Sequence, residues 1–204
     1  ALLSAYLEAA LEERPHGAPA VIAHPHCFYP RPMPHIGDVG CPVDEAKIQR
    51  RFLLTTTKKP LWLTPELVFL GEIDRISGVI PDRQKRRTFL TPEGLLEDRL
   101  LDDSALAYLG PDGLVIITGC THAGVPNLIE HAKRVTGETR IRDIIGGFHL
   151  KATDRETIDA TVAYLKEVRP AALHPCHCTS LAAKIALAAV APVGEVGVGL
   201  ALQY

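Results

Sequence analysis

The second half of the chain alternates between apolar segments of strand length and segments of helical length. Two apolar runs, 105–109 and 114–118, flank a Gly-Pro-Asp-Gly turn, which predicts a β-hairpin. After the hairpin we expect helices over about 125–136, 154–168 and 181–190, and strands over 141–145, 171–173 and 193–202. Strands that alternate with helices predict a layered α/β fold.

The first half of the chain is less regular. Residues 25–42 contain five prolines and are expected to form a loop. We expect a helix over 2–14, a strand over 18–23, a helix capped by Asp44 over 44–52, a strand, turn and strand over 61–71, and a solvated loop at the charged run 82–87.

The length and charge of the chain exclude several classes of protein. Its 204 residues fit one domain, which we assign to 1–204, and a net charge of −2 argues against nucleic-acid binding. The chain contains no uncharged apolar run of about 18 residues, so no membrane association is expected. The five cysteines do not form a disulfide pattern, and the N-terminal segment lacks a basic signal region. A reducing cytoplasm is the expected location.

Three loops that follow predicted strands contain residues that commonly bind metals. These loops are Thr-Gly-Cys-Thr-His at 118–122, Gly-Gly-Phe-His at 146–149 and Pro-Cys-His-Cys-Thr at 175–179. Because sites in α/β folds collect at the carboxyl ends of strands, these loops are expected to converge. A single strand-end histidine is more often structural, so the prediction rests on all three loops together.

The residues alone favour some of these side chains over others. On an extended segment Cys176 and Cys178 would face away from His177, so we predict His177 as a ligand and the two cysteines as packing residues. His131 is expected at the surface of its helix. Of the histidines in the proline-rich loop, His24 is the strongest functional candidate because it directly follows a strand.

The three loop motifs, taken as 113–124, 145–150 and 175–179, resemble the metallo-β-lactamase superfamily. They are most similar to the branch of 7,8-dihydropterin-6-methyl-4-(β-D-ribofuranosyl)aminobenzene-5′-phosphate synthase-like proteins. Segments 23–28, 71–75 and 102–106 support the same branch. The resemblance implies a four-layer αββα sandwich with one or two metal ions at one edge. The superfamily motif His-x-His-x-Asp-His does not occur in this chain, and we expect it, with the first strands, to lie upstream of Ala1.

The resemblance also implies roles for individual residues. Cys120 stands where the superfamily usually has a metal-bridging Asp, His177 matches the last superfamily histidine, and His122 could replace the middle one in space. We therefore predict Cys120, His122 and His177 as metal ligands. His149 is predicted to be catalytic, as a proton donor or oxyanion contact, with a ligand role as the alternative.

The function implied is a metal-dependent hydrolase that acts on an ester or phosphoester of a small anionic molecule. Zinc is the expected ion, with manganese or iron as alternatives. His24 and Arg75 are predicted to bind substrate, together with the basic residues of 83–87. A homo-oligomer is left open. The alternatives are a pterin-pathway synthase that condenses its substrates, and a non-catalytic metal or redox module that uses the cysteines.

Overall fold

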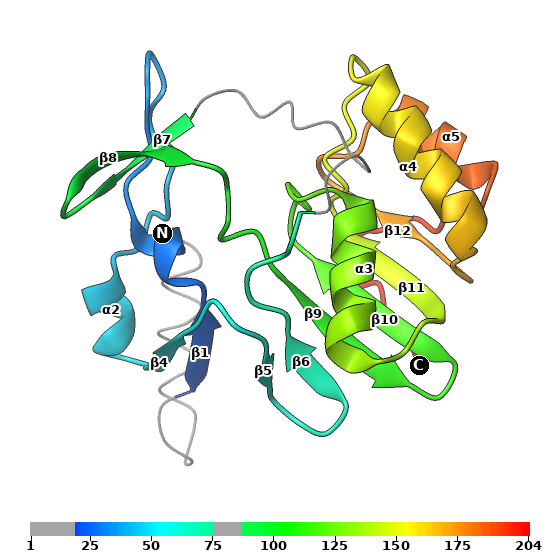
Figure 1. The fold of residues 1–204 in the computed structure, drawn as a ribbon, viewed down its shortest axis with the longest axis horizontal. Helices are drawn as coiled ribbons and strands as arrows, with labels where there is room; N and C mark the ends of the chain where they lie inside the picture. The colour runs from blue at the N-terminus through cyan, green and yellow to red at the C-terminus, as the bar shows by residue number, and fades with distance from the viewer. Residues whose placement is uncertain (1–18, 76–86) are drawn as a thin grey trace.

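The computed structural model describes residues 19–75 and 87–204, and Figure 1 shows its architecture. The predicted helix 2–14 and the charged run except Arg87 lie outside these residues. The largest element is a six-stranded sheet in the order β12-β11-β10-β9-β6-β5. Its strands are β5 (Leu61–Trp62), β6 (Leu67–Phe69), β9 (Ala105–Gly110), β10 (Gly113–Thr118), β11 (Ile141–Gly146) and β12 (His174–Pro175).

The sheet combines antiparallel and parallel pairing. The predicted hairpin is confirmed: β9 pairs with β10 in antiparallel register, with Gly110 opposite Gly113. β10 pairs with β11, and β11 with β12, in parallel register. The carboxyl ends of these three strands therefore lie at the same edge of the sheet, which is the edge that carries the three predicted loops.

Three helices follow the parallel strands, as the alternation predicts. They are α3 (Val125–Thr136), α4 (Arg155–Val168) and α5 (Leu181–Ala188). Asp154 and Ser180 cap α4 and α5 through their side chains, and Gly137 ends α3 in the left-handed conformation. The apolar faces of the helices and the sheet form one core, which includes the fully buried Leu114, Ile144 and Leu165.

The N-terminal part forms a separate set of small elements beside the sheet (Figure 1). β1 (Ala20–Ala23) runs parallel to β4 (Leu53–Thr56), with the short helices η1 (Pro25–Phe28) and α2 (Glu45–Gln49) between them. Two hairpins complete this part, β2 (Pro32–Met33) with β3 (Gly37–Asp38), and β7 (Arg87–Thr91) with β8 (Gly94–Asp98).

A buried arginine ties this part to the sheet. The Arg31 guanidinium contacts the carboxylates of Asp98 and Asp102, each at 2.8 Å. Asp98 ends β8, and Asp102 lies in the turn before β9. These two charge-assisted contacts hold the proline-rich segment against the chain that leads into β9.

One predicted strand is wrong. Residues 193–202 form no strand, and only an isolated bridge joins Val193 to Leu173. Val198 is fully exposed, so there is no buried face to stabilise strand pairing, and three glycines interrupt the segment. Among the residues that the model describes, no helix is long and apolar enough to cross a membrane.

Candidate metal centre

The loop after β10 is held in an unusual conformation by its own side chains and by its neighbours. Thr121 has a φ of 52°, which is uncommon for a residue with a side chain. Its hydroxyl donates to the Gly147 carbonyl at 2.7 Å and contacts the Thr118 hydroxyl at 2.9 Å. The amide of Ala123 donates to the Asp103 carboxylate at 2.8 Å. This network fixes Cys120 at the rim of the sheet.

The loops after β11 and β12 are joined to the first loop by backbone bonds. Gly147 donates its amide to the Gly119 carbonyl at 2.7 Å, and Cys176 donates to the Gly146 carbonyl at 2.8 Å. Phe148, which is 1% exposed, donates its amide to the Thr179 hydroxyl at 3.0 Å. The three loops therefore form one connected unit rather than three independent ones.

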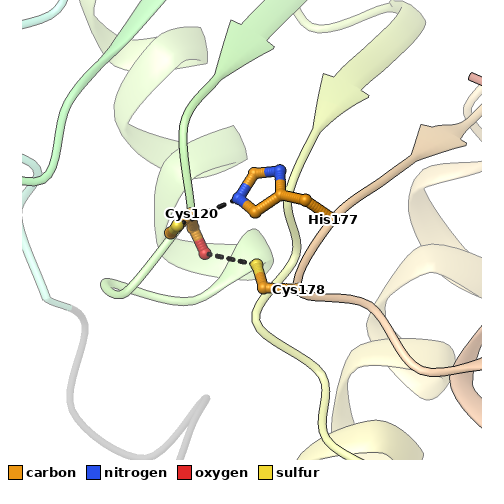
Figure 2. A group of neighbouring side chains, drawn as sticks. All are labelled: Cys120, His177 and Cys178. Atoms are coloured by element: carbon orange, nitrogen blue, oxygen red, sulfur yellow. Dashed lines mark hydrogen bonds between the residues drawn. The ribbon is translucent and has the colours of Figure 1, made fainter. Parts of the chain in front are cut away.

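Two cysteines and a histidine meet where these loops join (Figure 2). The Cys120 Sγ lies 3.0 Å from the His177 Nε2, and Cys178 lies beside them. The ligand atoms of Cys120, His177 and Cys178 all lie within 4.8 Å of one another. The two predicted ligands Cys120 and His177, which are 57 positions apart, are therefore brought together by the fold.

The packing role of Cys178 stays a prediction, but the expectation that its side chain lies on the side away from His177 is wrong. It assumed an extended segment with alternating side chains, whereas residues 177 and 178 form a turn between β12 and α5. In a turn the alternation of strand side chains does not apply, so the imidazole and the Cys178 thiol point to the same side. The short span between Pro175 and the Ser180 cap of α5 was the sequence signal for this turn.

The close approach of the group depends on the missing side chain at Gly147. A Cβ atom built there would lie 2.5 Å from the Cys178 Sγ and 2.6 Å from the His177 Nε2. Real Cβ atoms do not approach other atoms so closely. Glycine at this position therefore creates the space in which the two side chains lie.

The electrostatic environment keeps the Cys120 thiol protonated at neutral pH in the absence of an ion. Burial raises its pKa to about 11, and the neighbouring Cys178 adds to this effect. A cation bound between the side chains would reverse the effect, because the thiolate is the form that binds metal.

Thiol and imidazole donors suit an ion of the kind that the fold family implies. Sulfur and nitrogen ligands select zinc, iron or copper and disfavour magnesium or calcium. The space left by the missing side chain at Gly147 and the chemistry of these donors thus fit a bound transition-metal ion, with Cys120 and His177 as ligands.

The other two predicted histidines lie against each other. The rings of His122 and His149 have their centroids 4.3 Å apart, tilted by 58°. Among the described residues His122 is not part of the compact group of metal-type ligand atoms, so its predicted ligand role stays a prediction. His149 has a φ of 49°, and its amide donates to the Cys178 Sγ at 3.2 Å.

A cavity of about 470 Å³ opens beside the group. Its polar lining comes from both parts of the molecule and comprises Cys27, Arg31, Cys41, Asp102, Asp103, Ser104, Cys120 and His122. Burial raises the pKa of the Asp103 carboxyl above its ordinary value, although the amide of Ala123 partly offsets this. Arg31 brings a guanidinium to the wall, but Asp98 and Asp102 balance its charge.

The predicted substrate-binding residues do not line this cavity. His24 is 2% exposed, contacts Glu72 through Nε2 at 3.3 Å and accepts the amide of His26 at Nδ1. Arg75 donates to the carbonyl oxygens of Arg99 and Leu100. These contacts join segments of the chain, and the proposed contact of either residue with a substrate stays a prediction.

Two further histidines differ from expectation. His131, predicted at the surface, is 6% exposed because its ring packs under the Leu70 carbonyl, 3.1 Å from Nε2. His174, to which the sequence assigned no role, lies 2.7 Å through Nδ1 from the buried carboxylate of Asp143, which also accepts the hydroxyl of Tyr204. No local motif indicates this cluster, because its three members come from separate segments.

The fold is that of the metallo-β-lactamase superfamily. The crystal structure of a metal-dependent hydrolase of the β-lactamase superfamily superposes with a TM-score of 0.80 and 21% sequence identity, over 92% of this chain and 72% of that one. No protein-family model matches the chain.

Among curated proteins, the chain is similar to the 7,8-dihydropterin-6-methyl-4-(β-D-ribofuranosyl)-aminobenzene-5′-phosphate synthase of Methanocaldococcus jannaschii. The two are 29% identical over 145 residues, which is 69% of this chain and 48% of the synthase. An uncharacterised protein of the same organism is 32% identical over 88 residues, 43% of this chain and 31% of that protein. The chain thus spans about half, or less, of the curated relatives it matches. The resemblance to this branch is confirmed in sequence, and the resemblance to the superfamily is confirmed in fold.

Proposed function

We propose that the protein is a metal-dependent hydrolase that cleaves an ester or phosphoester bond of a small molecule bound in the cavity beside Cys120. The observation that carries the proposal is the meeting of Cys120 and His177, 3.0 Å apart, beside a cavity of about 470 Å³ that Cys120 lines. Donors for a transition metal and room for a small molecule thus occur side by side, as a hydrolytic metal site requires.

When bound, such an ion would lower the pKa of a coordinated water to about 7 and so supply hydroxide at neutral pH. The chain's own residues hold and orient the reactants. Cys120 and His177 would hold the ion, and His149, whose ring centroid lies 4.3 Å from that of His122, would act as proton donor to a leaving group. Arg31 lines the cavity wall, where Asp98 and Asp102 hold its guanidinium.

The test is a turnover assay on purified protein loaded with zinc, manganese or iron, using a panel of phosphodiesters, esters and lactones. We expect hydrolysis of at least one class, and loss of metal and activity in His177→Ala. The control is His35→Asn, which changes an exposed histidine outside the site while suiting its positive φ. Metal-loaded protein that hydrolyses nothing in the panel would overturn the proposal, as would His177→Ala with full metal occupancy.

Similarity to a curated synthase favours a second candidate, a reaction that joins two molecules. Mass spectrometry of products separates the two. Hydrolysis adds water across one bond, whereas condensation joins two substrates into a product larger than either and releases a small leaving molecule. A non-catalytic thiol module is the third candidate. Alkylation of the cysteines that leaves metal content and turnover intact would exclude it.

A further inference from the structure

We propose that Cys178 is a third protein ligand of the metal ion, so that two thiolates and one imidazole make this a site for a thiophilic ion such as Zn²⁺. The inference rests on the proposed function for the presence of an ion, but it does not depend on which bond is cleaved.

The first support is the geometry of the donor atoms. The Sγ atoms of Cys120 and Cys178 and the His177 Nε2 all lie within 4.8 Å of one another. Two donors of one tetrahedral zinc ion lie about 3.6–3.8 Å apart, given bond lengths of about 2.3 Å to sulfur and 2.0–2.1 Å to nitrogen. The three atoms therefore need only side-chain adjustments of about 1 Å to share one ion.

The second support is the set of contacts around the donors. The amide of His149 donates to the Cys178 Sγ at 3.2 Å, and it does so from a backbone with a φ of 49°, which a residue with a side chain rarely adopts. The Cys176 Sγ lies 3.4 Å from the His177 Nδ1, the ring nitrogen opposite the one that faces Cys120. Metal ligands are usually oriented by such outer contacts.

The third support is the space left at Gly147, which has no side chain. A Cβ there would collide with both His177 and Cys178 but with no other side chain among the three nearest atoms. The backbone thus leaves open the space that these two side chains share. A cysteine that served only as a packing residue would not need its Sγ next to an imidazole nitrogen at a solvent-exposed rim.

The proposal predicts a preference between ions. Binding replaces the thiol protons of Cys120 and Cys178 by the ion, and the protons pass to the buffer. Sulfur donors favour Zn²⁺ over Mn²⁺, so Cys178→Ser should weaken binding of Zn²⁺ more than binding of Mn²⁺.

The experiment compares Cys178→Ser with the matched control Cys176→Ser, which removes a thiol two residues away on the other side of the His177 ring. Zn²⁺ affinity is measured by competition with a chromophoric chelator, and Co²⁺ is added to record the sulfur-to-cobalt charge-transfer band. We expect Cys178→Ser to weaken Zn²⁺ binding by more than the roughly tenfold effect typical of outer contacts and to lower the cobalt band by about half. Cys176→Ser should retain the full band.

An alkylation measurement on the protein without substitutions tests the same ligand and does not depend on whether a variant folds. Zn²⁺ should protect Cys120 and Cys178 from alkylation, as mapped by mass spectrometry, and leave Cys41 as reactive as before. Equal alkylation of Cys178 with and without Zn²⁺, or an unchanged cobalt band in Cys178→Ser, would overturn the assignment. Tight binding through Cys178 without any turnover would instead refute only the hydrolase proposal.

Discussion

We expect the substitution Gly147→Ala to weaken metal binding while it changes the free energy of unfolding only slightly. The added Cβ would lie 2.5 Å from the Cys178 Sγ and 2.6 Å from the His177 Nε2, whereas ordinary contact begins at 3.4 Å. The nearest His177 atom, Cε1 at 2.4 Å, must therefore retreat by about 1.0 Å and the Cys178 Sγ by about 0.9 Å. Because metal–ligand distances stay within about 0.2 Å of their usual values, we expect the displaced donors to bind one ion more weakly.

The cost to the fold should be small by comparison. The atoms that the new Cβ meets are the ends of side chains that can rotate, so we expect the free energy of unfolding of the metal-free protein to fall by about 1 kcal/mol, the low end for overpacking. Gly146→Ala provides the contrast, because its Cβ would collide with the backbone carbonyl of Thr118 at a φ of 137°. That variant should lose about 3 kcal/mol or more.

The assay is urea unfolding of the metal-free protein together with a Zn²⁺ competition titration. Gly147→Ala should bind Zn²⁺ at least tenfold more weakly, by analogy with the loss of outer contacts, and unfold almost like the parent. Gly197→Ala, whose Cβ meets nothing within 4 Å, should change neither quantity. Unaltered Zn²⁺ affinity in a folded Gly147→Ala protein would refute the reasoning that this glycine shapes the site.

Three further predictions concern protons and buried contacts. Burial raises the pKa of Cys120 to about 11, so Zn²⁺ affinity should rise with pH by up to about tenfold per pH unit for each thiol proton released. Competition titrations between about pH 6 and 8 measure this dependence, and an affinity that does not change with pH would contradict thiol ligation. Burial lowers the pKa of His24 below its ordinary value of 6.5, so this neutral ring stabilises the fold above about pH 6.5 and less as pH falls through the lowered pKa. The loss of folding stability at low pH should be smaller in His24→Gln, as measured by urea unfolding across pH, and should persist in His35→Asn. Asp143→Ala should cost about 3 kcal/mol in the same assay, because it removes the buried carboxylate that contacts His174 and accepts from the Tyr204 hydroxyl and the Ile144 amide. Tyr204→Phe should cost about 1 kcal/mol, and equal losses would contradict this.

Local sequence patterns predicted the elements that depend on turn residues, capping side chains or apolar periodicity. The hairpin around 110–113, the helices at 125–136 and 154–168 and the cap at Asp44 all lie where the sequence indicates. Turn glycines, capping side chains and apolar periodicity act within a few residues, so they can be read without knowing the rest of the fold. The segment 193–202 shows the limit of this approach, because alternation predicts a strand only where a partner strand exists.

The sequence by itself determined that Cys120 and His177 follow strands of an α/β fold, and hence that they would approach one edge of a sheet. Only the tertiary structure decided that Cys178 joins them, because its direction depends on a turn between Pro175 and Ser180 and on the space left by Gly147. The burial of His131 and the pairing of Asp143 with His174 are also tertiary, since each depends on a segment distant in sequence. Sequence spacing fixes which residues are near in the chain, whereas donor geometry depends on side-chain directions that only packing sets.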